Sequence, residues 1–188
     1  MRVECHVFAG LGGPLFARGT KALDHLMDEL SPVWDANHWY HQQWERACDG
    51  IISRAKARGD KPKVILIGHS YGALRNIQIA RRLKSVGLDV EYIAGIDPTA
   101  LPLGEPPMSV PDNVRFIDEF HATSGWPAGA RRRDPSGGAG GMYVYPASRD
   151  KDSYSVHIVP GGHIPCASDP KVVSTIVAAV KALTGAAK

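Results

Sequence analysis

The chain has 188 residues, of which 44% are hydrophobic and 22% are charged, as is typical of a globular protein with a buried core. The formal net charge is only +3, and no basic stripe alternates with aromatic residues, which argues against nucleic acid as a partner. There is no signal-peptide pattern, no transmembrane segment and no disulfide framework among the three cysteines. We therefore predict a cytoplasmic protein, with release by cell lysis left open.

The first part of the chain has the pattern of a strand, a turn and a helix. Residues 3–8 predict a strand, and the segment that follows, 9–14, is rich in glycine. Over 17–30, apolar residues recur every three to four positions, as on one face of a helix. We expect Pro32 to end this helix, and a weaker strand pattern follows at 33–36.

The middle of the chain alternates between helix and strand. Residues 41–58 predict a helix that Gly59 ends. The short apolar run at 64–67 is typical of a strand that is buried on both faces. A helix over 72–86 and a buried strand over 90–96 follow.

The last part of the chain contains an unusual segment between two strands, which we expect at 114–117 and 155–159. The segment at about 121–153 is rich in glycine and arginine and is too long for a plain connection, so it is either a functional loop or a mobile one. The closing helix is expected over 170–183, with Asp169 as its N-cap.

Strands that alternate with helices predict a parallel sheet covered on both faces. We therefore expect one domain over 1–188, a three-layer α/β/α sandwich around a mostly parallel six-stranded sheet. Right-handed crossovers favour the strand order second, first, third, fourth, fifth, sixth in chain numbering.

The motif with the most chemical content is Gly-His-Ser-Tyr-Gly at 68–72, which matches G-x-S-x-G. It follows the buried strand at 64–67 directly and opens the next helix, which is the setting of a nucleophile elbow. In so tight a turn the first and last residues should lack side chains, as Gly68 and Gly72 do. Ser70 is then the predicted nucleophile, with the helix N-terminus favouring the negative charge that develops in acyl transfer.

With this motif in this context, the chain resembles the α/β-hydrolase superfamily over nearly its whole length. It is similar to small, lidless members, because the two leading antiparallel strands of larger members are missing. The resemblance implies a catalytic triad in the chain order serine, acid, histidine, each member at the carboxyl end of a strand.

Two residues are candidates for the acid. Asp97 follows the strand after the elbow helix, in a Gly-hydrophobic-Asp-Pro sequence similar to that of some lipases. Asp118 follows the next strand, the usual place in larger superfamily members. We favour Asp97, because the Asp-Pro turn stops the chain just beyond the sheet, and we keep Asp118 as the alternative.

The histidine that fits the superfamily's order is His163, in a glycine-rich loop after the last strand. His157 alternates within a strand and is better explained by packing, and His69 is expected to shape the elbow. The predicted triad is therefore Ser70, Asp97 and His163. For the oxyanion hole we expect the backbone N–H groups of Tyr71 and of Leu11 in the glycine-rich turn after the first strand.

This triad predicts a serine hydrolase that cleaves carboxylic esters or thioesters of small acyl substrates through an acyl-enzyme on Ser70. The alternatives are an acyltransferase or amidase with the same triad, or a non-catalytic binding protein on the hydrolase fold. We expect no cofactor and no metal: His38 and His41 are three residues apart, but no further ligand completes a site with them.

Overall fold

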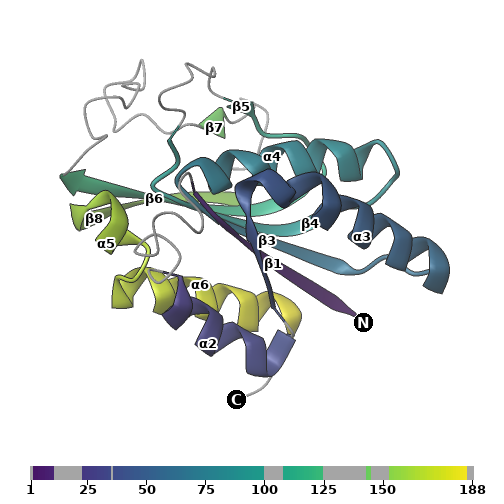
Figure 1. Ribbon diagram of the computed structural model, residues 1–188, viewed down its shortest axis with the longest axis horizontal. Helices are drawn as coiled ribbons and strands as arrows, with labels where there is room; N and C mark the ends of the chain where they lie inside the picture. Colours follow the sequence, from purple (N-terminus) through teal and green to yellow (C-terminus); the bar gives the residue numbers. More distant parts are fainter. Residues whose placement is uncertain are drawn as a thin grey trace.

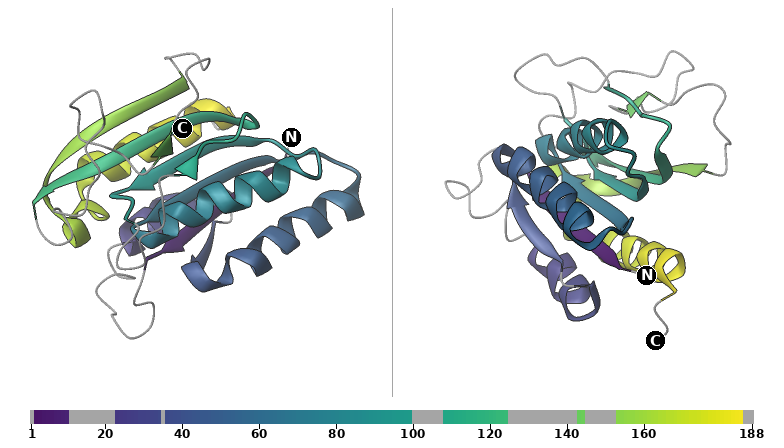
Figure 2. Two further views of the ribbon diagram at one scale, coloured as in Figure 1. Left: turned by 90° about the horizontal axis from the view of Figure 1, so that it is seen from above. Right: turned by 90° about the vertical axis from the view of Figure 1, so that its right-hand side faces the viewer.

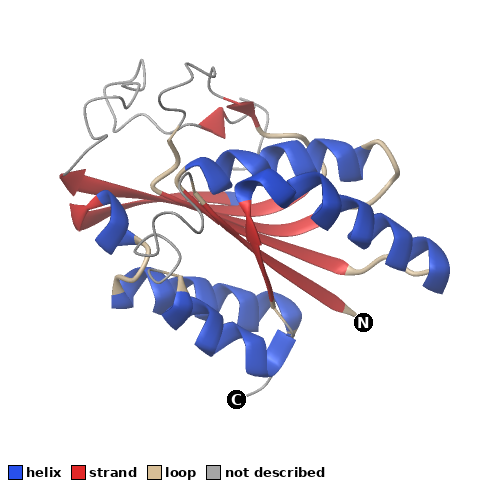
Figure 3. Cartoon of the chain, viewed as in Figure 1, coloured by secondary structure: helices blue, strands red, loops and turns tan. Residues whose placement is uncertain are grey.

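The computed structural model describes residues 2–10, 23–34, 36–99, 108–124, 143–144 and 153–185. At its centre is a six-stranded sheet in the order β2-β1-β3-β4-β6-β8, and every neighbouring pair is parallel (Figures 1 and 3). The strands are β1 (Val3–Ala9), β2 (Asn37–Tyr40), β3 (Lys63–His69), β4 (Val90–Ile96), β6 (Val114–Ser124) and β8 (Tyr154–Gly162). The predicted fold class and strand order are therefore confirmed.

Helices cover both faces of this sheet, as Figures 1 and 2 show. One face carries α2 (Asp24–Trp34) and α6 (Pro170–Thr184), and the other carries α3 (Trp44–Arg58) and α4 (Tyr71–Lys84). The central strands alternate between the two cores: Ile65 and Ile67 of β3 pack on the α2/α6 side, and Val64 and Leu66 on the α3/α4 side. Burial on both faces explains why β3 reads as a continuous apolar run.

The ends of several helices match their sequence signals. Asp169 caps α6 by accepting hydrogen bonds from the backbone N–H groups of Lys171 and Val172, as expected of an N-cap aspartate before proline. Gly59 ends α3 in the left-handed conformation, with φ of 63°. A short 3₁₀ helix, η2 (His41–Gln43), precedes α3, so the helix predicted from residue 41 begins as a 3₁₀ turn.

The prediction that Pro32 ends the first helix is wrong, because α2 continues through Pro32 to Trp34. The missing N–H of Pro32 deprives the carbonyl four residues earlier, at Asp28, of its helical partner. Both residues are exposed, so water can take the place of the missing partner. Burial of Trp34 and the hydrogen bond from its indole N–H to Thr184 Oγ1 (3.1 Å) hold the last turn.

Two strands also differ from their predicted bounds. The second strand lies at Asn37–Tyr40 and not at 33–36, because the last turn of α2 occupies the earlier residues. β6 runs for 11 residues to Ser124, well beyond the apolar run at 114–117. The start of the predicted 121–153 loop therefore belongs to β6, and Tyr143–Val144 form β7, which pairs with β5 (Met108–Ser109) in a separate two-stranded sheet. Residues 125–142 and 145–152 of that predicted loop lie outside the described residues.

Candidate active site

Ser70 lies in the sharp turn between β3 and α4, with φ of 57° and ψ of −126°. Few residues other than glycine adopt a positive φ, so the surrounding contacts must hold this conformation. The Ser70 N–H donates to the carbonyl of Ile96 (2.8 Å), which ties the turn to the end of β4. The serine is 8% exposed, at the carboxyl edge of the parallel sheet.

The two glycines of the motif are required by close backbone contacts. A Cβ at Gly68 would lie 2.6 Å from the backbone of Ala73, and one at Gly72 would lie 2.3 Å from the carbonyl oxygen of Phe8. Both distances are far below van der Waals contact, so neither position can accept a side chain without movement of the main chain. Gly68 lets α4 turn back on β3, and Gly72 lets α4 rest on β1.

Asp97 leaves the sheet beside Ser70. His69 of β3 is paired with Ile96 of β4, so the next residue of each strand, Ser70 and Asp97, lie at the same edge. Adjacent strands are about 4.8 Å apart. Asp97 is 1% exposed and has a positive φ of 42°, the second non-glycine residue with this conformation among those the structure describes.

Both carboxylate oxygens of Asp97 have defined partners. Oδ2 lies 2.6 Å from Nδ1 of His163, and Oδ1 accepts a hydrogen bond of 3.0 Å from the backbone N–H of Ala122 in β6. His163 is the first residue of the short helix α5 (His163–Cys166), directly after β8, and its side chain is 13% exposed. The carboxylate therefore fixes Nδ1–H of the imidazole and leaves Nε2 as the basic nitrogen.

His69 supports the segment that carries His163, a contact that the sequence pattern did not reveal. Its Nε2 donates to the backbone carbonyl of His163 (3.0 Å), and the two rings lie 4.6 Å apart. Burial, followed by the nearby His163, lowers the pKa of His69 to about 4. His69 is therefore neutral at pH 7. Its hydrogen bond joins the end of β3, directly before Ser70, to the backbone of His163.

Asp118, the alternative acid, does not lie at the end of a strand as predicted. β6 continues past it to Ser124, and Asp118 is paired with Ala94 in the body of the sheet. Its carboxylate accepts hydrogen bonds from His157 Nε2 (2.8 Å) and from the Tyr92 hydroxyl (2.7 Å). Burial, with the charge of Asp118, raises the pKa of Tyr92 well above its usual value, so the phenol stays a donor.

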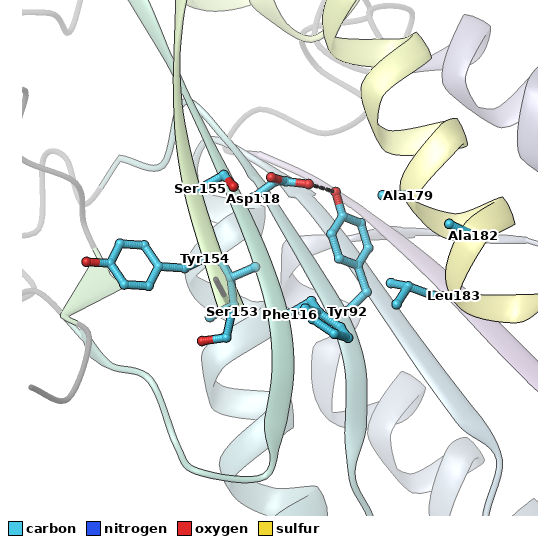
Figure 4. Close-up of a pocket in the computed structure, with 10 residues that line it drawn as sticks. Tyr92, Phe116, Asp118, Ser153, Tyr154, Ser155, Ala179, Ala182 and Leu183 are labelled. Carbon is cyan, nitrogen blue, oxygen red and sulfur yellow. Dashed lines mark hydrogen bonds between the residues drawn. The ribbon is translucent and has the colours of Figure 1, made fainter. Parts of the chain in front are cut away.

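Asp118 and Tyr92 line a cleft of about 210 Å³ between the sheet and α6 (Figure 4). Ala179, Ala182 and Leu183 of α6 form one wall, and Asp118 and Tyr92 of the sheet face them. The structure thus brings His163 to Asp97, and gives Asp118 different partners.

Of the predicted oxyanion donors, Tyr71 is described and Leu11 lies outside the described residues. Tyr71 is the first residue of α4 and is 3% exposed, so its N–H belongs to a helix N-terminus directly after Ser70. The residue before Leu11 is described: a Cβ at Gly10 would lie 2.7 Å from Cβ and 3.1 Å from Oγ of Ser70. Gly10, directly after β1, therefore packs against the serine.

The described residues contain neither a cluster of metal-ligating side chains nor an exposed cysteine. That part of the chain holds no group of three or more His, Cys, Asp or Glu side chains placed to bind a metal ion. Its three cysteines are buried thiols, and burial raises the pKa of Cys5 to about 12 and that of Cys48 to about 11. No helix within the described ranges is long and apolar enough to cross a membrane.

The parallel sheet with helices on both faces is an α/β-hydrolase fold. Solved structures with this fold match the chain over nearly its full length. A candidate hydrolase of the alpha/beta superfamily from Xanthomonas campestris pv. campestris is 17% identical, with 98% of this chain and 99% of that chain covered and a TM-score of 0.52. Human thioesterase 2 is 10% identical, with 98% of each chain covered and a TM-score of 0.57.

A third similar structure is the NocB thioesterase domain in covalent complex with a fluorophosphonate nocardicin G analog. It is 13% identical, with 99% of this chain and 96% of that chain covered and a TM-score of 0.53. At such identities the likeness establishes the shared fold. No protein-family model and no curated protein matches the chain.

Proposed function

We propose that the protein is a serine hydrolase that cleaves carboxylic esters or thioesters through an acyl-enzyme on Ser70. The observation that carries the proposal is the 2.6 Å contact between His163 Nδ1 and Asp97 Oδ2, at the edge of the sheet where Ser70 occupies a strained turn. A nucleophile on such a turn, a buried carboxylate and an imidazole oriented by it are the parts that acyl transfer requires.

In this mechanism His163 Nε2 takes the proton of the Ser70 hydroxyl as Oγ attacks the acyl carbonyl. Asp97 keeps the second proton on Nδ1 and stabilises the imidazolium that forms. The Tyr71 N–H, at the start of α4, donates to the tetrahedral oxyanion. His163 then returns its proton to the leaving alcohol or thiol, which departs and leaves the acyl-enzyme. A water molecule, deprotonated by His163, then attacks the acyl-enzyme. His163 returns that proton to Ser70 Oγ as the bond to the acyl group breaks and the acid leaves.

Ser70→Ala tests the nucleophile directly. No other group replaces the missing hydroxyl, so we expect hydrolysis of p-nitrophenyl esters and acyl-CoA thioesters to fall to background while the unfolding midpoint in urea changes little. Wild-type rates in Ser70→Ala on a substrate that the wild-type protein turns over would contradict the proposal. The ratio of kcat/KM between the ester and thioester series, at matched acyl-chain length, assigns the substrate class.

A further inference from the structure

His41 is a buried histidine that the mechanism above does not use. It opens η2 at the carboxyl end of β2 and is 4% exposed. Ala9 of β1 is paired with Tyr40 of β2, so the next residues, Gly10 and His41, leave the sheet side by side. His41 Nδ1 lies 3.0 Å from the carbonyl oxygen of Gly10. Because a carbonyl only accepts, Nδ1 carries the proton of this bond.

The carbonyl that His41 holds belongs to the residue that packs on the nucleophile. Gly10 lies so close to Ser70 that its Cβ, if present, would be 2.7 Å from the serine Cβ. A hydrogen bond that fixes the Gly10 carbonyl therefore also fixes the backbone that packs against the serine side chain.

The same imidazole contacts the first predicted donor residue. The rings of His41 and Tyr71 meet edge to face, with their centroids 5.1 Å apart. The Arg75 guanidinium lies 4.4 Å from the centroid of the Tyr71 ring, so the Tyr71 ring contacts a cation as well as the imidazole. One side chain thus joins Gly10, directly after β1, to the first turn of α4.

The protonation state of His41 suits a fixed donor. Burial lowers the pKa of His41, the hydrogen bond to Gly10 partly opposes this, and the charge of Arg75 lowers it further. His41 is therefore neutral at pH 7, with Nδ1–H directed at the Gly10 carbonyl. It adds no positive charge that would compete with the imidazolium of His163.

We propose, resting on the hydrolase function above, that His41 is a positioning residue for the oxyanion hole. It holds the Gly10 carbonyl and the start of α4, which carries the Tyr71 N–H, in the relative geometry that receives the tetrahedral oxygen. It touches neither the acyl group nor the reacting atoms, and its effect appears in the transition state and not in substrate binding.

The test compares His41→Phe, which keeps a ring but loses the Nδ1 donor, with His41→Asn, whose amide N–H takes the place of Nδ1–H. Loss of a whole oxyanion donor costs about 10²- to 10³-fold in kcat, so displacement of one should cost about 10- to 100-fold. We expect His41→Phe to lose that factor in kcat, with KM changed less than about twofold, and His41→Asn to recover most of it. The rate at which a fluorophosphonate labels Ser70 should fall in parallel, because its phosphoryl oxygen occupies the oxyanion position.

The matched control is His38→Phe, the same change at an exposed position of β2, the strand that ends directly before His41. This variant should leave kcat and the labelling rate unchanged. Equal kcat and labelling rates in His41→Phe and the wild type would overturn the inference. It would also be overturned if His41→Asn lost as much kcat as a His41→Phe protein that folds. If His41→Phe does not fold, His41→Gln replaces it, because its longer amide cannot stand at the Nδ1 position. Failure of the wild-type protein to react at Ser70 would instead overturn the proposed function and this inference with it.

Discussion

The replacement of Asp97 by asparagine separates the two candidate acids. The new amide can keep the bond from the Ala122 N–H through its oxygen, as Asp97 does through Oδ1. The amide NH₂ then faces Nδ1 of His163 where the carboxylate oxygen stood, at 2.6 Å in the present structure. Two donors cannot share that contact, so the imidazole must shift its proton to Nε2. An imidazole protonated at Nε2 cannot accept the proton of Ser70.

The expected loss in turnover is therefore large while the loss in stability is small. A wrong histidine tautomer lowers kcat by about four orders of magnitude in the serine protease precedent. Because the Ala122 hydrogen bond survives, we expect the free energy of unfolding to fall by no more than about 1–2 kcal/mol. Asp118→Asn disturbs the hydrogen bonds to His157 and Tyr92 but not that of His163. It should lower the free energy of unfolding by a similar amount, while kcat stays near the wild-type value.

The assay is the steady-state hydrolysis of p-nitrophenyl esters by both variants, with urea unfolding of each as the control for folding. Asp97→Asn should be almost inactive and folded, and Asp118→Asn should be active. The assignment of the acid is refuted if Asp118→Asn shows the four-order loss and Asp97→Asn retains wild-type turnover.

Two further predictions concern stability. Gly72→Ala should lower the free energy of unfolding by about 1–3 kcal/mol, because its Cβ would lie 2.3 Å from the Phe8 carbonyl oxygen, and urea unfolding measures this. Gly50→Ala in helix α3, where the atoms nearest to a Cβ are the far end of the Arg54 side chain at 3.0 Å, should instead stabilise by about 0.5–1 kcal/mol. Burial lowers the pKa of His69 from 6.5 to about 4. Between pH 4 and 6.5, His69 therefore binds fewer protons in the folded protein than in the unfolded chain. Its contribution to stability is therefore present above pH 6.5 and is lost as the pH falls toward 4, with a slope of up to about 1.4 kcal/mol per pH unit. His69→Gln should flatten the pH dependence of the unfolding free energy between pH 4 and 6.5, and an unchanged slope would contradict this reasoning.

The sheet could be predicted from the sequence because its central strands carry strong local signals. The structure has the central elements where the sequence pattern predicts them: the apolar run at 64–67, the glycines at 68 and 72, and the strand at 90–96. β6 was predicted too short because Asp118, Glu119 and His121 interrupt its apolar pattern. All three belong to the strand, and Glu119 and His121 are buried there. Pairing with β4 and β8, which local sequence does not reveal, keeps the strand extended.

The candidate site was predictable to the extent that its residues follow strands. Ser70, Asp97 and His163 each come directly after a strand, so their meeting at one edge follows from the parallel topology. The contacts of His69 and His41 could not be predicted, because each joins segments far apart in the chain: His69 with His163, and His41 with Gly10. Such contacts depend on the register of neighbouring strands.

The central claim is that Ser70 is an activated nucleophile, and mass spectrometry of the protein after reaction with a fluorophosphonate tests it most directly. We predict one adduct for each chain, mapped by peptide digestion to Ser70, with no adduct in Ser70→Ala and a much slower reaction in Asp97→Asn. A folded wild-type protein that forms no adduct, or that carries the adduct on another residue, would contradict the account.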